Sequence, residues 1–148
     1  MVLFLTLQFI TMPLYRYLEH RSDLLIEGKG HSLPRAIESI AQGLFNAISS
    51  KNASPANSSE VKFSESGVDM QDLIINIFTR VLAEMDSHSK IGISLKVLKL
   101  DAENNTADVL LTLADGPARL HVKAVTFHDF SLSKTEDGLT VVRVLFDI

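Results

Sequence analysis

Two segments of the chain repeat apolar residues at the spacing of an amphipathic helix. The first follows Ser32, a residue type that caps helix N-termini, and has Pro34 in its first turn, where the missing proline N–H needs no partner. The second begins near Asp69, has Asp72 three residues later in a capping-box-like arrangement, and extends to about Asp86. The apolar stripes of these two predicted helices are Ala36, Ile37, Ile40, Ala41, Leu44, Phe45 and Ile48, and Leu73, Ile74, Ile77, Phe78, Val81, Leu82 and Met85.

The chain before the first helix has the pattern of two short strands. Residues 14–19 alternate apolar and polar side chains and residues 24–27 are apolar-rich, on either side of His20–Asp23. Gly28 and Gly30 follow, and glycines at such positions are expected to end the second strand.

After Ile91 the pattern becomes that of strands. The predicted strands cover residues 91–97, 109–113, 120–127 and 141–146. Turn signals separate them at Asn104-Asn105, Asp115-Gly116 and Asp137-Gly138. Between the helices, residues 49–60 are rich in Ser, Asn, Ala and Pro without an apolar period, which predicts a mobile surface loop. The order of strands, helix, helix and antiparallel meander indicates an α+β fold, a mostly antiparallel sheet with both helices packed on one face.

The length of 148 residues favours one domain, and 46% hydrophobic with 22% charged residues is ordinary for a globular protein. The segment Val2–Ile10 is almost wholly apolar but is too short to span a membrane. It also lacks the charged lead-in and small-residue cleavage site of a secretory signal. Met12 would be a natural start. We therefore predict that residues 1–11 are an apolar extension, either from an upstream start or as an extra edge strand, and that residues 12–148 form a single domain.

Composition also limits the classes of function. The chain has no cysteine, which excludes disulfides, cysteine-ligated zinc and thiol nucleophiles and fits an intracellular protein of the cytoplasm or nucleus. Its formal net charge of −4 is opposite to that of a protein whose main task is to grip a phosphate backbone. RNA is therefore expected to be contacted only indirectly, through a partner protein, and no membrane partner is expected.

Conventional catalytic signatures are missing from the sequence. It contains no P-loop, no dinucleotide-binding glycine run, no nucleophile elbow and no HExxH motif. The five histidines do not group at metal-ligand spacing. The local patterns alone describe an α+β domain with scattered acidic residues.

Four segments together resemble the archease family. They are EHRSD at Glu19–Asp23, SLPRAIESIAQGLFNAI at Ser32–Ile48, KAVTFHDF at Lys123–Phe130, and the terminal Phe146-Asp147-Ile148. The first follows the aromatic pair Tyr15 and Tyr17 and is similar to the family opening Y-x-[DE]-H-T-A-D. The chain departs from the family pattern where Arg21-Ser22 replaces Thr-Ala and Pro34-Arg35 replaces Glu-Glu. The four segments lie in the family's order and extend over almost the whole chain from Leu14.

The resemblance implies a cation site formed by Asp23, Asp147 and the α-carboxylate of Ile148. Three anionic groups held close together repel one another unless a cation or protons neutralise them. Oxygen ligands without His or Cys favour a hard divalent ion, and a flexible terminus suits calcium better than magnesium, which remains the second choice. Without the resemblance, Asp23 would be interpreted as a turn or cap residue and Asp147 as part of a solvated chain end. The apolar, strand-like ending VRVLFDI argues against a frayed terminus.

The resemblance also implies a ligase-activation surface that includes Lys123, Glu38, His20 and His128. Lys123 would serve as a cation for a phosphate or a partner carboxylate, although the strand pattern also permits an ordinary exposed lysine. By itself, Glu38 would be a solvated acid of the first helix. A lone histidine is more often a structural hydrogen-bonding residue than a catalyst.

The function implied by the resemblance is that of a non-catalytic activator. An archease-like protein binds the RtcB-class tRNA-splicing ligase transiently, promotes guanylylation of the ligase by GTP and allows multiple turnover. Two alternatives stay open: a stand-alone metal-dependent enzyme that acts on a phosphate compound, and a structural module in which the metal only fixes the C-terminus. Turnover without a partner would favour the first alternative, and ligase stimulation that survives metal removal would favour the second.

Overall fold

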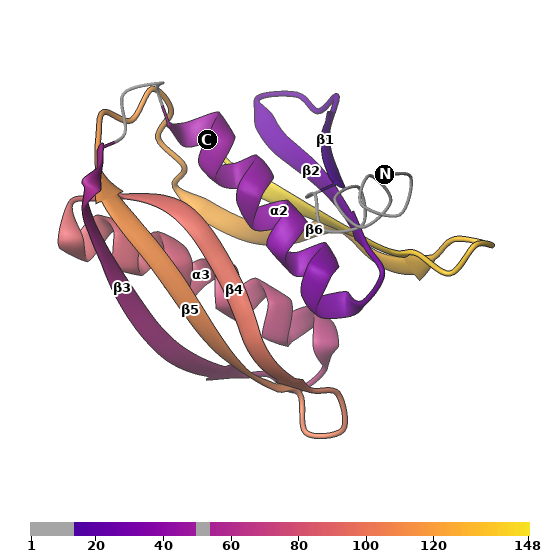
Figure 1. The fold of residues 1–148 in the computed structure, drawn as a ribbon. Coiled ribbons are helices and arrows are strands. Elements are labelled where there is room, and N and C mark those ends of the chain that lie inside the picture. The colour runs from indigo at the N-terminus through magenta and orange to yellow at the C-terminus, as the bar shows by residue number, and fades with distance from the viewer. Residues whose placement is uncertain (1–13, 50–53) are drawn as a thin grey trace, which may run out of the picture.

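The computed structural model describes residues 14–49 and 54–148, which form seven strands and two helices (Figure 1). The elements are β1 (Leu14–Leu18), β2 (Asp23–Gly30), α2 (Leu33–Ile48), β3 (Ser54–Ser66), α3 (Met70–His88), β4 (Ile91–Asp101), β5 (Thr106–Asp115), β6 (Ala124–Lys134) and β7 (Thr140–Asp147). The predicted α+β class is confirmed. The predicted extension over residues 1–11 lies outside the described residues. Within the described ranges, no helix combines the length and apolar character needed to cross a membrane.

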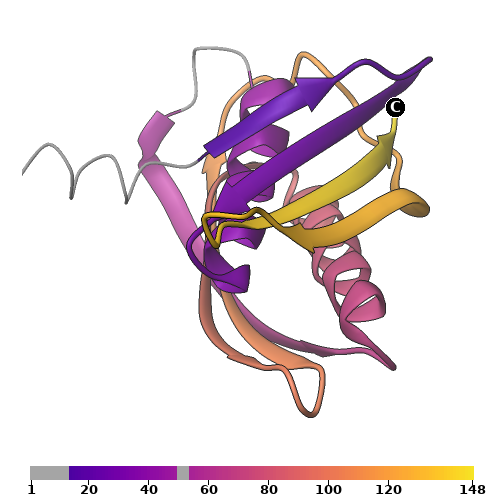
Figure 2. The same ribbon diagram turned by 90° about the vertical axis from the view of Figure 1, so that its right-hand side faces the viewer.

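The strands form two antiparallel sheets instead of the single meander predicted. One has the order β1-β2-β7-β6 and the other β3-β5-β4 (Figure 2). The hairpins at Asn104-Asn105 and Asp137-Gly138 are present, with Gly138 at φ +88°. The turn predicted at Asp115-Gly116 is not a hairpin, because the following segment leaves β5 and joins the other sheet. A backbone hydrogen bond from Arg119 N to Ile48 O, 2.8 Å long, holds this crossing segment to the end of α2.

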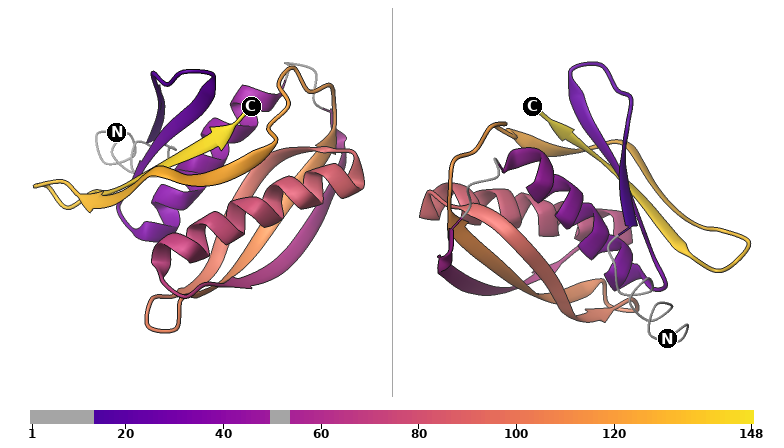
Figure 3. Two further views of the ribbon diagram at one scale, coloured as in Figure 1. Left: turned by 180° about the vertical axis from the view of Figure 1, so that it is seen from behind. Right: turned by 45° about the horizontal axis from the view of Figure 1, so that its top comes forward.

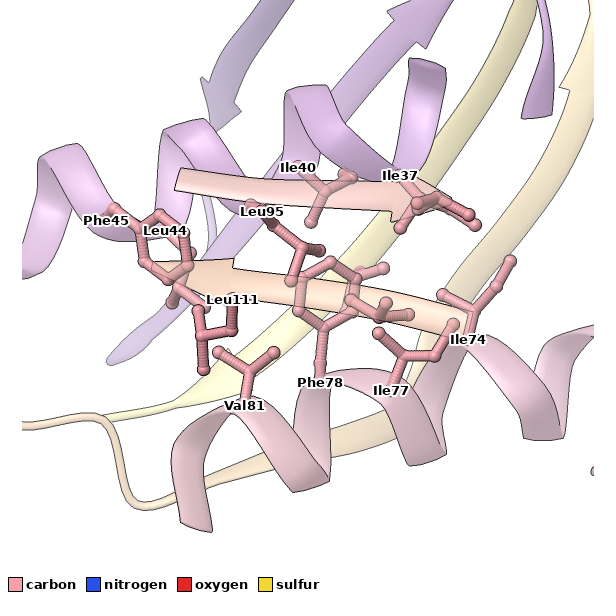
Figure 4. Packing of buried hydrophobic residues seen from close by; sticks show 14 of the residues in the cluster. Ile37, Ile40, Leu44, Phe45, Ile74, Ile77, Phe78, Val81, Leu95 and Leu111 are labelled. Carbon is pink, nitrogen blue, oxygen red and sulfur yellow. The ribbon is translucent and has the colours of Figure 1, made fainter. Parts of the chain in front are cut away.

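Both helices cover one face of the four-stranded sheet, as predicted, and each also contacts the three-stranded sheet (Figure 3). Helix α2 packs against β2 and β4, and α3 packs against β6 and β3. The predicted N-caps are present, since Ser32 accepts from Arg35 N and Asp69 from Asp72 N. Apolar side chains from both helices and both sheets meet in one core, where the rings of Phe78 and Phe146 contact edge to face at 5.6 Å. Figure 4 shows the part of this core that lies between the helices and strands β4 and β5.

Strand β2 ends at Gly30, as predicted, whereas Gly28 lies inside the strand instead of ending it. A Cβ atom at Gly28 would come within 2.7 Å of Ala36 O, and one at Gly30 within 2.6 Å of Ala36 N. Glycine inside a strand often marks such a close backbone approach. The two residues therefore allow α2 to lie directly on β2.

The loop prediction for residues 49–60 was wrong from Ser54 onward. Strand β3 pairs with the central strand β5, and residues 50–53 lie outside the described part of the chain. The first half of β3 is Ser- and Asn-rich and lacks the residues that favour strands. Its pairing is supported instead by the neighbouring strand and by buried Phe63 further along.

Candidate functional site

The pairing of β2 with β7 brings the first and last parts of the predicted cation site together. Asp23 and Asp147 are direct partners across the two strands. Directly opposed residues of an antiparallel pair project to the same face, with Cβ atoms about 4.5–5.5 Å apart. Gly28 contacts α2, so strand alternation places Asp23, five residues earlier, on the face away from the helices. In Figure 2 the C-terminus lies beside the turn between β1 and β2.

The chain end is held on both sides. Asp147 pairs with Asp23 of β2 and with Ala124 of β6. The N–H of Lys123 donates to the carbonyl of Asp147 at 2.8 Å, and the half-buried side chain of Ile148 packs against the core. The terminal residues are therefore fixed in the sheet, which is what ligation by an α-carboxylate requires.

His20 connects this end of β2 to the edge strand β6. Its Nε2 lies 2.8 Å from Asp129 Oδ2, and its Nδ1 lies 3.4 Å from Asp23 Oδ2 without hydrogen-bond geometry. The ring of His128 lies 6.5 Å from the His20 ring, centroid to centroid. Because β2 and β7 lie between β1 and β6, the contact from His20 to Asp129 passes over the outer face of the sheet.

Asp129 was not predicted as a site residue. It occupies an irregularity of β6 in which the register to β7 shifts between Thr126 and Ser131, and it has φ +56°. A non-glycine residue in the left-handed region is uncommon, although Asp is one of the types that tolerates it. The only sequence signal was its position next to His128 in the KAVTFHDF segment.

Lys123 lies beside the same chain end and borders a cavity on the side of the helices. It immediately precedes β6 and lines a cavity of about 620 Å³ together with Leu82 and Met85 of α3. Its side chain is exposed and forms no ion pair with any of the described residues. An exposed ammonium without an ion pair can bind a phosphate or a carboxylate of another molecule.

Glu38 is not brought to this end of the molecule. It lies in the second turn of α2, which starts at the opposite end of β2 from Asp23. Its Oε2 accepts from Val97 N at 2.9 Å, and its Oε1 is paired with Arg35. Since β4 has a register shift between Val97 and Lys99, Glu38 provides a partner for an N–H at a point where the strand pairing is irregular.

The residues present fit a divalent cation in chemistry, although the side chains are not preassembled around one. Nowhere in 14–49 or 54–148 do three His, Asp or Glu side chains group closely enough to hold an ion. The predicted set contributes two such side chains, Asp23 and Asp147, and a main-chain carboxylate at Ile148. In addition, His20 Nδ1 is the one buried side-chain nitrogen or oxygen of the described residues that lacks a hydrogen bond, and it faces Asp23.

A buried ion cluster lies on the same face of the sheet, further along β2. Glu27 is paired with Arg16 of β1 at 2.7 Å and with Arg143 of β7 at 2.9 Å, and these three residues are register partners. The hydrogen bond from Arg16 lowers the pKa of Glu27, with a further contribution from Arg143, against the opposing effect of burial. Both arginines are paired with Glu27, four residues from Asp23 along β2, so this cluster supports the sheet and is separate from the candidate site.

Known proteins match this chain over most of its length. A model of the Archease protein family (MTH1598/TM1083) matches residues 15–148. The chain belongs to this family. Among curated archease proteins, that of Thermococcus kodakarensis is 26% identical and that of Pyrococcus abyssi 27% identical, each over 93% of this chain and 100% of the relative.

Solved archease structures share the fold. The solution structure of protein 1598 from Methanobacterium thermoautotrophicum has a TM-score of 0.66 at 22% identity and covers 90% of this chain and 98% of that one. The crystal structure of a Thermotoga maritima protein, described as an archease and possible chaperone, has a TM-score of 0.52 at 17% identity over 90% of this chain and 96% of that one. This archease chain thus has relatives over almost its whole length.

Proposed function

We propose that this archease is a non-catalytic activator of an RtcB-class tRNA-splicing ligase and that it acts through a divalent cation bound at its chain end. The supporting observation is the register of β2 and β7, which pairs Asp23 with Asp147 beside an anchored terminus. Membership of the archease family supports an accessory role, and the Thermotoga maritima relative is described as a possible chaperone. The ligase itself would contact the RNA, within the cytoplasm or nucleus.

The cation would be held by Asp23, Asp147 and the terminal carboxylate of Ile148. Calcium is the first choice and magnesium the second, because these ligands are hard oxygen donors. Such an ion, when bound, supplies positive charge that stabilises a phosphoryl group during transfer. Lys123 would bind a phosphate oxygen or a carboxylate of the ligase near the same end, since its ammonium group is exposed and unpaired among the described residues.

The proposal is tested by ligase guanylylation. Purified RtcB-class ligase is mixed with labelled GTP and a divalent ion, and labelled ligase is followed over time with and without this protein. We expect the protein to raise the rate at least tenfold and to support several ligation cycles when it is present in less than molar amount. An unchanged rate at full molar excess would refute the activator role. Turnover of a phosphate compound by this protein alone would favour the stand-alone enzyme instead.

A variant locates the effect at the chain end. Asp147→Ala should lose most of the stimulation, because it removes one of the two carboxylates that face each other across β2 and β7. Glu60→Ala, which changes an exposed acid of β3 far along the chain, is the matched control and should stimulate like the unchanged protein. Equal stimulation by both variants would contradict the assignment of Asp147.

A further inference from the structure

The two nitrogens of the His20 ring have different surroundings. Nε2 lies 2.8 Å from Asp129 Oδ2, and an ionised carboxylate can only accept a hydrogen bond, so Nε2 carries a proton that it donates. In the neutral ring the other nitrogen, Nδ1, then presents a lone pair. This atom is buried from water and has no hydrogen-bond partner.

The Nδ1 atom lies close to a second electron-rich group. Asp23 Oδ2 lies 3.4 Å from it, outside hydrogen-bond geometry. Such a contact between two acceptors is relieved either by a proton on Nδ1 or by a metal cation beside both atoms. Two ligand atoms that each lie about 2.1 Å from one ion, with a ligand–ion–ligand angle between a right angle and the tetrahedral angle, are roughly 3.0–3.4 Å apart. The observed separation falls in that range.

Asp129 has the position of an orienting group. A histidine that ligates a metal usually donates its other ring N–H to a carboxylate or carbonyl, which fixes the tautomer and the ring orientation. Here the carboxylate belongs to the irregular part of β6, and the ring belongs to the turn between β1 and β2. The hydrogen bond therefore also joins the segment that carries Asp23 to the edge strand beside the chain end.

We propose that His20 is a ligand of the cation site through Nδ1, next to Asp23, and that Asp129 orients its ring. The side chains of His20, Asp23 and Asp147 are not grouped around an ion beforehand, so the binding of the cation draws them together. This inference rests on the cation site of the proposed function and adds a nitrogen donor to its oxygen ligands. Calcium does not need such a donor, whereas imidazole suits first-row transition ions. His20 would therefore extend the range of bound ions to Co²⁺ and Zn²⁺, with little effect on Ca²⁺.

The variant test compares two histidines of the same cluster. The affinities of the isolated protein for Co²⁺ and Ca²⁺ are measured by calorimetry for the unchanged chain, His20→Ala and His128→Ala. The His128 side chain is 77% exposed and faces Asp129 instead of Asp23, so it is the matched control. We expect His20→Ala to lose at least tenfold in Co²⁺ affinity and less than threefold in Ca²⁺ affinity, with no change for His128→Ala. Equal Co²⁺ affinities in the two variants would overturn the proposal.

A spectroscopic measurement needs no variant and so does not depend on the folding of one. The imidazole ¹⁵N resonances of the unchanged protein are recorded before and after saturation with Zn²⁺. A ligating Nδ1 should shift strongly on metal binding while Nε2 of His20 keeps its proton and its bond to Asp129. An unmoved His20 Nδ1 resonance would also overturn the inference.

Failure of the inference can be separated from failure of the proposed function. Both metal measurements use the isolated protein, so they do not depend on the ligase. A His20-dependent Co²⁺ site in a protein that does not stimulate the ligase would support this inference and refute the activator role. If neither Ca²⁺ nor Co²⁺ binds the unchanged protein, both the cation site and the assignment of His20 as a ligand are refuted.

Discussion

Among the described residues Glu27 is the only charged side chain that is buried, with 2% of its surface exposed. Its two carboxylate oxygens are shared between Arg16 and Arg143, so one residue of β2 links the strands on both sides. Removing one partner of a buried pair is costly because it leaves the other partner uncompensated. The two arginines are 60% and 43% exposed, however, so water can solvate them.

The lowered pKa of Glu27 predicts how stability depends on pH. Since the folded-state pKa lies below the unfolded value of 4.5, the native state holds the ionised form. Its contribution to stability is complete above about pH 4.5 and is lost as the pH falls through the lower folded pKa. Glu27→Gln should lower the free energy of unfolding at pH 7 by about 1–3 kcal/mol and flatten its decrease in acid. Urea unfolding at pH 7 and at pH 4 measures both effects.

The control for this prediction is Glu60→Gln, which changes an exposed acid of β3. It should leave both the free energy of unfolding and its acid dependence close to those of the unchanged protein. If Glu27→Gln behaves like Glu60→Gln at both pH values, the Arg16–Glu27–Arg143 cluster does not stabilise the sheet.

Single residues could be predicted from the sequence where they belong to a segment that resembles the family motif. Asp23, Asp147 and Lys123 were named from the resemblance, and the structure places them at one end of the four-stranded sheet. Asp129 was not predicted, because its position depends on a left-handed backbone conformation and a register shift that no sequence pattern predicts. Glu38 was assigned to the ligase-activation surface. That role stays a prediction, and the structure adds a local bond to Val97.

At the level of elements, the two glycines of β2 determine how closely α2 can lie on the sheet. Gly28→Ala would place a Cβ atom 2.7 Å from Ala36 O, which is a backbone atom of the helix and cannot rotate away. The helix must therefore shift, and overpacking of this kind costs about 1–3 kcal/mol. We expect a lower melting temperature, measured by calorimetry. Ser133→Ala, at an exposed position of β6, is the control.

An unchanged melting temperature for Gly28→Ala would mean that α2 can move off β2 without cost. The close approach at Gly28 would then not determine the position of the helix.

The helices were predicted well because their apolar stripes and their caps at Ser32 and Asp69 agree with each other. The second sheet was not predicted, for two physical reasons. The start of β3 is stabilised by pairing with β5 and not by its own Ser- and Asn-rich sequence. The segment after Asp115 crosses between sheets, and a turn signal alone does not distinguish a crossing from a hairpin.

On the scale of the whole molecule, the fold joins two parts of the chain that are 124 residues apart. The aspartate that opens β2 and the one that ends β7 meet only because these two strands are neighbours in the sheet order. Strand patterns in the sequence give no such order, so the meeting was expected from the family resemblance alone. The pairing also explains why the last residues are ordered to the end of the chain.

The central claim is that this chain end forms a cation site, and a Ca²⁺ titration of two proteins tests it most directly. One protein ends at Ile148, and the other carries two added glycines, which move the terminal carboxylate away while leaving Asp23 and Asp147 unchanged. We predict that calorimetry finds Ca²⁺ bound to the first protein and at least tenfold weaker binding to the second. Equal Ca²⁺ affinity in the two proteins, or none in the first, would contradict the claim.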